Sequence, residues 1–250
     1  DISCSLVGSE MCIRDRYLAD MGLGTRSQIK KEIRSGQVIV NGISICRPEV
    51  KIDTAQDKVI FHGEPVTYEE YEYFMLNKHD GVISAANYRQ ETTVVDLIKD
   101  RKRDDLFPVG RLDKDTEGLL IITNNGELAH RLLSPKKHVD KVYFARIKGH
   151  VTQNDVENFS RGVDIGDEKP TLPADLVICT SDEISEIRLT IREGRFHQVK
   201  RMFQAVGKEV IYLKRLQMGG ITLDENLKTG EYRRLTEKEV ERLCSQERKP

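Results

Sequence analysis

One aspartate stands in a setting that acid–base or nucleophilic chemistry requires. Asp113 follows Gly110-Arg111-Leu112 in a polar loop and directly precedes the apolar run 117–123. An acid held before a buried strand has the rigid support that a nucleophile or general base needs. Arg111 would keep this carboxylate ionised if the two side chains meet. The competing interpretation is a turn aspartate that caps a helix or pairs with an arginine, and the pattern alone favours it.

An aromatic residue among cations marks a second candidate position. Tyr143 lies in a predicted strand and is flanked by Lys141 and Arg146. Such a ring can stack on a base that has been pulled out of a nucleic-acid helix. A strand tyrosine is more often a half-buried packing residue, so the motif by itself favours packing.

The third candidate is a helix that begins near Phe196. Gly194 permits a turn before it, and Lys200 and Arg201 follow within it. A helix N-terminus near cations favours an anion, because its unpaired N–H groups and the positive charge act together. Four apolar residues of this helix recur with helical spacing and are assigned to the core, namely Val199, Met202, Phe203 and Val206.

Basic residues gather in two stretches although the whole chain is nearly neutral. Forty basic and 41 acidic residues leave a net charge of -1, which excludes a uniformly basic surface. Five basic residues and one acidic residue lie between residues 22 and 48. Eight basic and two acidic residues lie between residues 188 and 215. Arg26, Lys30 and Arg34 are spaced by four and form one stripe of a predicted helix. Two such patches suit a polyanion such as RNA, although either alone is better explained as a solvated face.

The elements that must position these residues indicate an α+β fold with a largely antiparallel sheet. Thr25 and Gln28 form a capping box before a helix over 26–35, and Asn41-Gly42 predicts a hairpin. Beyond them, strands and helices mix without a regular βαβ alternation. The predicted strands are 73–77, 117–123, 141–148, 174–179, 186–192 and 210–216, and the predicted helices are 93–99, 127–133, 153–161, 196–206 and 237–243.

The same pattern divides the chain into two domains. Residues 1–16 are interpreted as a non-native or disordered leader, and 17–64 as a small module of helix and hairpin. The acidic run 65–72 is interpreted as a linker, 73–245 as the second domain and 246–250 as a tail. At roughly 150 residues per domain, a chain of 250 residues agrees with this division.

Several classes of protein are excluded. The chain has no G-x-x-x-x-G-K-[ST], no G-x-G-x-x-G before a helix, no G-x-S-x-G and no H-E-x-x-H. Its five cysteines form no C-x-x-C pair and have no histidine at zinc spacing, which favours a reducing cytoplasm. No apolar run approaches the roughly 18 residues of a membrane span. We therefore expect no cofactor, no metal and no membrane association.

Taken in order, the motifs resemble those of pseudouridine synthases. They are GRLD at 110–113 with the following DTEGLLIITNNGELAHRLLSP, then KVYFARI, EGRFHQVKRMF and YLKRL. The resemblance is strongest to the branch that modifies small-subunit ribosomal RNA, and residues 17–62 resemble an S4-type RNA-binding domain. It covers nearly all of the chain after residue 16, and the shared order and spacing are far more specific than any one motif.

The resemblance implies roles for individual residues. Asp113 would be the catalytic aspartate and Lys200 its basic partner. Tyr143 would stack on the target base, and Leu213 would line the uracil pocket. Arg111 completes the substrate-binding set, and RNA contacts are assigned to Arg26, Lys30, Lys31, Arg34, Arg201, Lys214 and Arg215.

The chain departs from the family pattern at one turn. Where the family usually has Lys-Pro before a glycine, this chain has Lys78-His79-Asp80-Gly81. Loss of the proline predicts a less rigid loop. We expect this change to affect none of the four principal site residues, which are Asp113, Tyr143, Lys200 and Leu213.

The implied function is isomerisation of one uridine of 16S ribosomal RNA to pseudouridine, by a monomer without a cofactor. Asp113 would assist either by attacking the anomeric carbon of the sugar or by removing the neighbouring sugar proton. Two alternatives stay open, namely a sister branch that acts on 23S ribosomal RNA and a non-catalytic RNA-binding assembly factor. A pure binder has no need for all four principal site residues, which argues against the second alternative.

Overall fold

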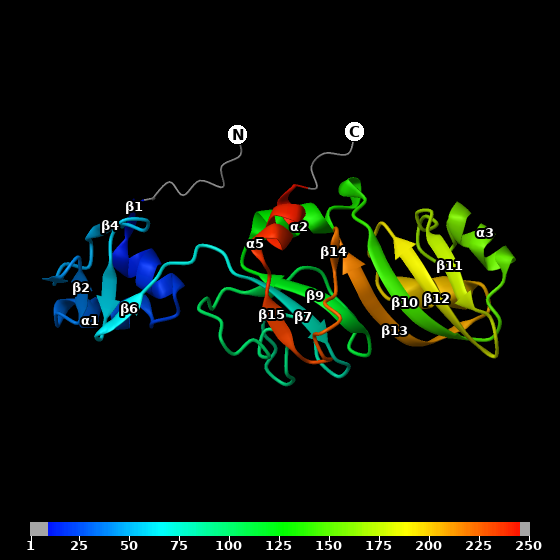
Figure 1. Cartoon of the computed structure of the whole chain (residues 1–250), viewed down its shortest axis with the longest axis horizontal. Coiled ribbons are helices and arrows are strands. Elements are labelled where there is room, and N and C mark those ends of the chain that lie inside the picture. The colour runs from blue at the N-terminus through cyan, green and yellow to red at the C-terminus, as the bar shows by residue number, and fades with distance from the viewer. Residues whose placement is uncertain (1–9, 246–250) are drawn as a thin grey trace. The chain divides into compact units, whose positions relative to one another are not determined.

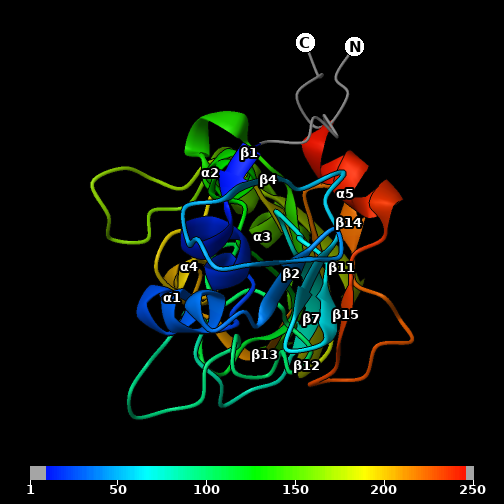
Figure 2. The same ribbon diagram turned by 90° about the vertical axis from the view of Figure 1, so that its left-hand side faces the viewer.

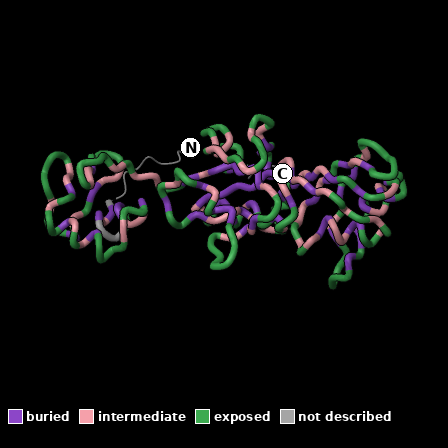
Figure 3. Tube along the Cα trace, turned by 90° about the horizontal axis from the view of Figure 1, so that it is seen from below, coloured by how far each residue is buried: buried purple, intermediate pink, exposed green. Residues whose placement is uncertain are grey.

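The computed structural model describes residues 10–245, which form two compact units (Figure 1). The N-terminal unit comprises the described residues up to Glu72 together with Asp100–Asp105. The C-terminal unit comprises Tyr73–Lys99 and the described residues from Leu106 onward. Figure 3 shows buried residues in the interior of each unit and exposed residues along its outer loops. The predicted tail 246–250 and the first nine residues of the predicted leader lie outside the described residues.

A helix packed on short antiparallel strands forms the N-terminal unit. Its elements are β1 (Glu10–Cys12), the π-helical turn η1 (Ile13–Leu18), α1 (Arg26–Arg34), β2 (Val38–Val40), β3 (Ile43–Ile45), β4 (Lys51–Asp53), β5 (Val59–Phe61) and β6 (Glu64–Val66). The capping box of Thr25 and Gln28 begins α1 as predicted, and Asn41-Gly42 joins the predicted hairpin of β2 and β3. Helix α1 lies beside η1 (Figure 2), and both contribute to one apolar core.

The expectation that residues 1–16 stand apart from the fold is wrong for the part that the structure describes. Strand β1 pairs antiparallel with β4, and Met11 and Ile13 are buried in the same core as Tyr17. The Tyr17 hydroxyl donates a hydrogen bond of 2.8 Å to the carbonyl of Val66. Sequence patterning missed this stretch because a strand of three residues has too few positions to show alternation, and its partner lies far along the chain.

Residues 65–72 are likewise part of the N-terminal unit and not a detached linker. The ring of Tyr68 stacks on that of Tyr17, with 5.3 Å between ring centroids. Glu72 is 1% exposed, and its carboxylate accepts hydrogen bonds from the backbone N–H groups of Lys102 and Arg103. The acidic run therefore includes a buried acceptor that holds the returning segment 100–105 to this unit.

A mixed sheet of nine strands in the described chain carries the C-terminal unit. Its order is β11-β12-β10-β13-β9-β7-β15, with β14 on β13 and β8 on β9. The strands are β7 (Tyr73–Lys78), β8 (Phe107–Pro108), β9 (Glu117–Thr123), β10 (Lys141–Lys148), β11 (Asp175–Thr180), β12 (Ile184–Ile191), β13 (Glu209–Met218), β14 (Ile221–Thr222) and β15 (Tyr232–Arg234). All pairs except β9 with β13 are antiparallel. The predicted α+β class with a largely antiparallel sheet is confirmed.

Helices cover both faces of this sheet. They are α2 (Gly126–Leu133), the 3-10 turn η2 (Pro135–Lys137), α3 (Gln153–Arg161), α4 (Gln198–Ala205) and α5 (Glu237–Cys244). Helices α2 and α5 share a core with Leu119 and Ile121 of β9, whereas α3 and α4 share the opposite core with Leu120 and Ile122. Successive side chains of a strand point to opposite faces, so β9 supports both cores.

The single parallel pair of the described sheet brings two distant segments together. In its register, Glu117 lies opposite Lys214 and Gly118 lies opposite Arg215. Gly118 has φ +99°, and a Cβ atom there would lie 2.3 Å from the backbone oxygen of Arg215. Only glycine permits this approach. The loop that precedes β9, and Asp113 with it, is thereby held next to β13.

The predicted helix over 93–99 is replaced by consecutive turns. Hydrogen bonds run from the N–H of Asp96 to the carbonyl of Thr93 (3.2 Å) and from Ile98 to Val95 (3.1 Å), which is turn geometry. Four β-branched residues in a row, 92–95, lose side-chain freedom in a helix and disfavour it.

Candidate active site

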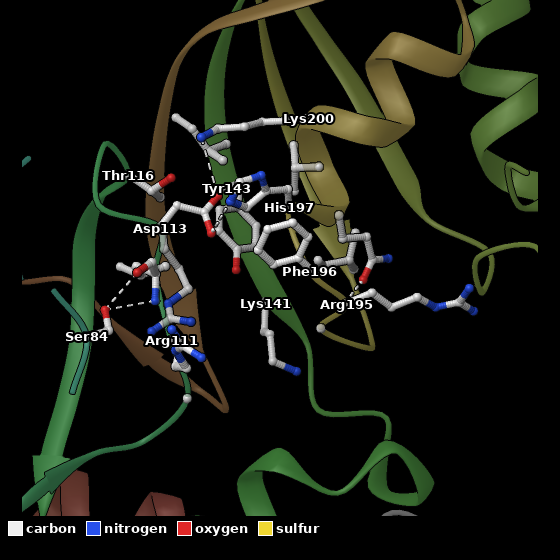
Figure 4. Close-up of a pocket in the computed structure, with 18 of the residues that line it drawn as sticks. Ser84, Arg111, Asp113, Thr116, Lys141, Tyr143, Arg195, Phe196, His197 and Lys200 are labelled. Atoms are coloured by element: carbon white, nitrogen blue, oxygen red, sulfur yellow. Dashed lines mark hydrogen bonds and ion pairs between the residues drawn. The ribbon is translucent and has the colours of Figure 1, made fainter. Parts of the chain in front are cut away.

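The loop between β8 and β9 is held by hydrogen bonds on both sides of Asp113 (Figure 4). The Ser84 hydroxyl donates to the carbonyl of Leu112 (2.8 Å) and accepts from its N–H (3.0 Å). The N–H of Thr116 donates to the carbonyl of Asp113 (3.0 Å). Asp113 thus has the rigid support that its place before a strand predicts, while its carboxylate stays 27% exposed.

A buried lysine ties the same loop to the end of β7. The Lys78 side chain is fully buried, and its ammonium donates to four backbone carbonyls, those of His79, Asp113, Lys114 and Thr116. Burial lowers the pKa of Lys78 to about 8. Segment 78–81 is thus connected to the site through its first residue, which binds the backbone of Asp113, while the effect of the lost proline stays a prediction.

Lys78→Met should destabilise the protein and reduce any activity that depends on Asp113. The substitution leaves four carbonyls without their shared donor. We therefore expect the free energy of unfolding to fall by at least about 2 kcal/mol. Urea denaturation of the purified variant measures this loss.

The matched control is Lys114→Met in the same loop. The ammonium of Lys114 is exposed and pairs with Glu91 at the surface, so its loss should change stability by no more than about 1 kcal/mol. Equal losses in the two variants would contradict the bracing role of Lys78.

Asp113 shares its cation with a second carboxylate. Lys200, on α4, places its ammonium 3.3 Å from Oδ2 of Asp113 and 2.6 Å from Oδ1 of Asp115. The hydrogen bond from Lys200 holds the pKa of Asp115 below its ordinary value. Nε2 of His197 lies 3.6 Å from the other oxygen of Asp113. The structure brings Lys200 to Asp113 as expected, whereas Arg111 forms no ion pair with Asp113 in the part of the chain that the structure describes.

One face of β10 and β13 forms the floor of the site. Tyr143 lies opposite Arg215 and Leu213 lies opposite Ala145, and residues directly opposite share a face of the sheet. Tyr143 and Leu213 are buried, and they line a pocket of about 820 Å³ together with Asp113 and Lys200. Among the described residues, the Tyr143 hydroxyl has no hydrogen-bond partner, so it is available to a ligand. Four residues that lie far apart in sequence thus meet in one pocket, and Figure 4 labels three of them, Asp113, Tyr143 and Lys200.

The wall of this pocket is strongly basic. Among its described lining residues Asp113 is the one carboxylate, against the cations Arg111, Lys114, Lys141, Arg195, Lys200 and Arg215. Arg111, Lys141 and Arg215 form no ion pair with any described residue. Burial, together with the nearby Arg215, lowers the pKa of Lys141 to about 8. Positive charge without a carboxylate partner favours an anionic ligand.

The predicted RNA contacts fall into two groups. Those on α1 carry no ion pair within the described chain and include two exposed arginines, at positions 26 and 34. In the C-terminal unit, Arg201 is held by the carbonyl of Ile165 and by Asp167. Arg215 is 2% exposed and donates from Nε to the carbonyl of Leu119 (2.8 Å). Arg215 therefore lies in the lining of the pocket and not on the open surface, and its contact with RNA stays a prediction. Lys214, next to it on the strand, is half-buried and lies on the opposite face from the pocket floor.

Sequence reasoning missed several residues of the site. The sequence predicted no functional role for Lys78, Asp115 or Phe196. It indicated Lys141 only as a cation beside Tyr143. A weak signal exists for Lys78, because a lysine at the end of an apolar strand must find acceptors if it is buried. Asp115 and Lys141 carry no such signal, since their importance depends on contacts across the fold.

Within the described residues, no cluster of histidine, cysteine or acidic side chains has the size of a metal site. No helix of this part of the chain is long and apolar enough to cross a membrane.

This fold and pocket agree with the family that sequence comparison identifies. The family model described as RNA pseudouridylate synthase matches residues 72–205, more than half of the chain. The chain belongs to this family and is an RNA pseudouridine synthase. The resemblance seen in the motifs is confirmed.

Individual relatives extend over both units. The uncharacterized RNA pseudouridine synthase YtzG of Bacillus subtilis is 46% identical, over 92% of this chain and 97% of that protein. Proteins named ribosomal small subunit pseudouridine synthase A from Haemophilus influenzae and Escherichia coli K12 are each 39% identical over at least 90% of this chain and 97% of their own length. A crystal structure of a pseudouridylate synthase matches with a TM-score of 0.66 and 38% identity, and the match covers 92% of this chain and 98% of that chain.

Proposed function

We propose that this enzyme isomerises one uridine of small-subunit ribosomal RNA to pseudouridine, with Asp113 as its catalytic carboxylate. The small-subunit assignment is supported by the relatives from Haemophilus influenzae and Escherichia coli, which are named ribosomal small subunit pseudouridine synthase A and align over nearly their full length. The site assignment is supported by the geometry of the pocket.

One observation carries the assignment of Asp113. It is the one carboxylate among the described lining residues of a basic pocket, its charge is balanced by Lys200 (3.3 Å), and a buried tyrosine ring lies beside it. A target base enters such a pocket only when it leaves its stack, and cationic walls offset that cost by binding the neighbouring phosphates. The chemistry then takes place next to the carboxylate.

The reaction moves one bond and conserves every atom. The bond from C1′ of ribose to N1 of uracil breaks, the ring turns, and a bond from C1′ to C5 forms. C5 then loses its proton, and N1 ends protonated, so no oxidant and no group donor takes part. Asp113 assists the first cleavage either by attack on C1′ or by removal of the C2′ proton. Both routes require an ionised carboxylate.

The remaining pocket residues position the base. Tyr143 offers its ring for stacking on the uracil, and Leu213 offers an apolar contact on the same sheet face. Lys200 holds the charge and orientation of Asp113 and Asp115. Arg111, Lys141 and Arg215 are placed to receive negative charge from the RNA.

The N-terminal unit supplies RNA affinity in this proposal, as an S4-type domain would. Helix α1 carries the stripe Arg26, Lys30 and Arg34, while its Ile29 and Ile33 face the core. The stripe forms no ion pair with described residues, so its charge is available to phosphates. A helix stripe of this kind contacts phosphates through its charge and does not read the base sequence.

Replacing Arg26, Lys30 and Arg34 together by Ala should weaken binding to a small-subunit ribosomal RNA transcript and flatten its salt dependence. Each lost phosphate contact lowers the slope of log K against log salt by roughly 0.9 on duplex and about 0.7 on single strands. Turnover at saturating RNA should change little. Filter binding over a range of salt concentrations measures the slope.

The control for this experiment is the pair Lys238→Ala and Arg242→Ala. These residues are exposed, also four apart, on helix α5 of the other unit. We expect an unchanged slope for the control. Identical slopes in all three proteins would make the α1 stripe an ordinary solvated face.

Pseudouridine mapping across ribosomal RNA tests the proposed function itself. Cells that lack the gene should lose one pseudouridine of the small-subunit RNA, and the wild-type gene should restore it. Loss of a site in large-subunit RNA would identify the sister-branch substrate instead. Unchanged modification in both RNAs would contradict an activity on ribosomal RNA.

A further inference from the structure

One aromatic ring at the pocket has no place in the proposed catalytic set. Phe196 is 75% exposed, more than any other large hydrophobic side chain in the described chain. Single exposed apolar residues are common on protein surfaces and need no explanation by themselves. Phe196 lines the same pocket as Asp113 and Tyr143, and it is the most exposed of the large hydrophobic residues that do so, ahead of Tyr88 (53%) and Leu133 (42%).

The backbone around Phe196 holds the ring in this exposed position. Its carbonyl accepts a hydrogen bond from Nη1 of Arg201 (3.2 Å). On the preceding residue, Arg195, the N–H donates to Oε1 of Gln198 and the guanidinium donates to the carbonyls of Lys169 and Pro170. The ring is therefore presented by a segment that is braced on both sides.

His197 covers one face of the ring and leaves the other available. The two rings are stacked, with centroids 3.8 Å apart and planes inclined by 17° (Figure 4). His197 has φ +47°, a left-handed conformation that non-glycine residues adopt rarely. The same His197 lies 3.6 Å from Asp113, which fixes the Phe196 ring close to the catalytic carboxylate.

The physics of base extrusion gives this ring a task. When a uridine turns out of its stack, the base next to it loses a stacking partner. Proteins that insert side chains next to displaced bases offset that loss, and aromatic rings stack on any base because every base has a π-face. Tyr143 lies inside the pocket, where it can contact the target base. Phe196 is exposed at the same pocket, where it can contact the neighbouring base.

We propose that Phe196 stacks on the nucleobase that flanks the target uridine, on the face that the uridine vacates. His197 backs the ring from its other side. This inference rests on the proposed function, because it requires that an RNA base enters the pocket. It adds a positioning residue and an RNA contact outside the catalytic set.

The test couples a protein substitution to a change in the RNA. The wild-type enzyme is first used to find the modified uridine in ribosomal RNA transcripts, and a short RNA around that uridine is then made with each flanking base intact or removed as an abasic site. Stacking on one base is worth about 1–3 kcal/mol, which converts to an effect of about 5- to 150-fold. Phe196→Ala should lower kcat/KM on the intact RNA by a factor in that range, and Phe196→Tyr should retain most of the rate.

Removal of the correct flanking base should abolish the difference between wild type and Phe196→Ala. If the ring merely supports the fold of its loop, Phe196→Ala should instead lower kcat/KM by the same factor on both RNAs. Ile184→Ala is the matched control, because Ile184 is 51% exposed on β12 and does not line the pocket. Its kcat/KM should equal that of the wild type on every RNA.

Fluorescence of 2-aminopurine at the flanking position provides an independent readout. The bound RNA should stay quenched with the wild-type enzyme and brighten with Phe196→Ala, since the vacated face is then uncovered. If Phe196→Ala shows the rate and the fluorescence of the wild type, the inference is overturned while the proposed function stands. A wild-type enzyme that forms no pseudouridine in either ribosomal RNA overturns the proposed function, and this inference with it.

Discussion

Asp113→Asn should abolish pseudouridine formation, with a single-turnover rate lower by at least about 10³-fold. The amide keeps the shape of the side chain but can neither attack the sugar carbon nor accept a proton from its neighbour. Fold and RNA affinity should be nearly unchanged, because the loop is held by the backbone carbonyls and N–H groups of Leu112, Asp113 and Thr116 and not by the Asp113 carboxylate. Release of tritium from C5-labelled uridine measures the rate.

Asp115→Asn is the matched control for that result. Asp115 lies two residues away, contacts the same ammonium at 2.6 Å and is 70% exposed. An asparagine there should lower the rate by less than about 10-fold, since only the sharing of Lys200 changes. If Asp115→Asn proved as inactive as Asp113→Asn, the catalytic role could not be given to Asp113 alone.

Lys200→Met should have the second largest effect, a loss of about 10²-fold at neutral pH. Its ammonium orients two carboxylates at once, and small misplacements of a catalytic group cost factors of this size. Without this ammonium both carboxylates lose the cation that contacts them, which favours protonation of one of them. The rate of the variant should therefore recover in part as pH rises.

Lys200→Arg separates charge from shape. It restores a cation at similar reach, so most of the activity and a wild-type pH profile should return. The pKa of Asp115, which Lys200 holds below its ordinary value, should rise in the Met variant and stay low in the Arg variant. NMR titration of the Asp115 carboxyl measures this shift. A Met variant with a wild-type pH–rate profile would mean that Lys200 contacts only phosphate or solvent.

Local signals in the sequence predicted the elements that depend on near neighbours. The capping box at Thr25 and the Asn41-Gly42 hairpin both agree with the structure. In each case the deciding interaction lies within a few residues of the pattern that reveals it. The helix expected over 93–99 failed for the complementary reason, because its β-branched residues oppose the helix that the pattern suggested.

Boundaries and burial were decided by contacts that the sequence does not display. Met11 and Ile13 are buried by a strand far along the chain, so the first part of the fold looked like a leader. The sequence assigns Arg215 an RNA contact beside Lys214 but shows no sign that it is buried, whereas in the structure it is 2% exposed and donates to the carbonyl of Leu119 on β9. Composition cannot distinguish a solvated cation from one that a neighbouring strand covers.

Motif order and spacing are properties of the linear chain, so they were enough to predict the family, the residue types of the site and their order. Which of those residues meet depends on the folded structure. It paired Asp113 with Lys200 and His197 and left Arg111 without that contact. It also gave Lys200 a second carboxylate and set an exposed ring of Phe196 at the pocket. Side chains more than 80 positions apart, such as Lys200 and Asp115 with a separation of 85, come within 2.6 Å through the packing of α4 on the sheet. Distances of this kind follow from packing, which no local pattern encodes.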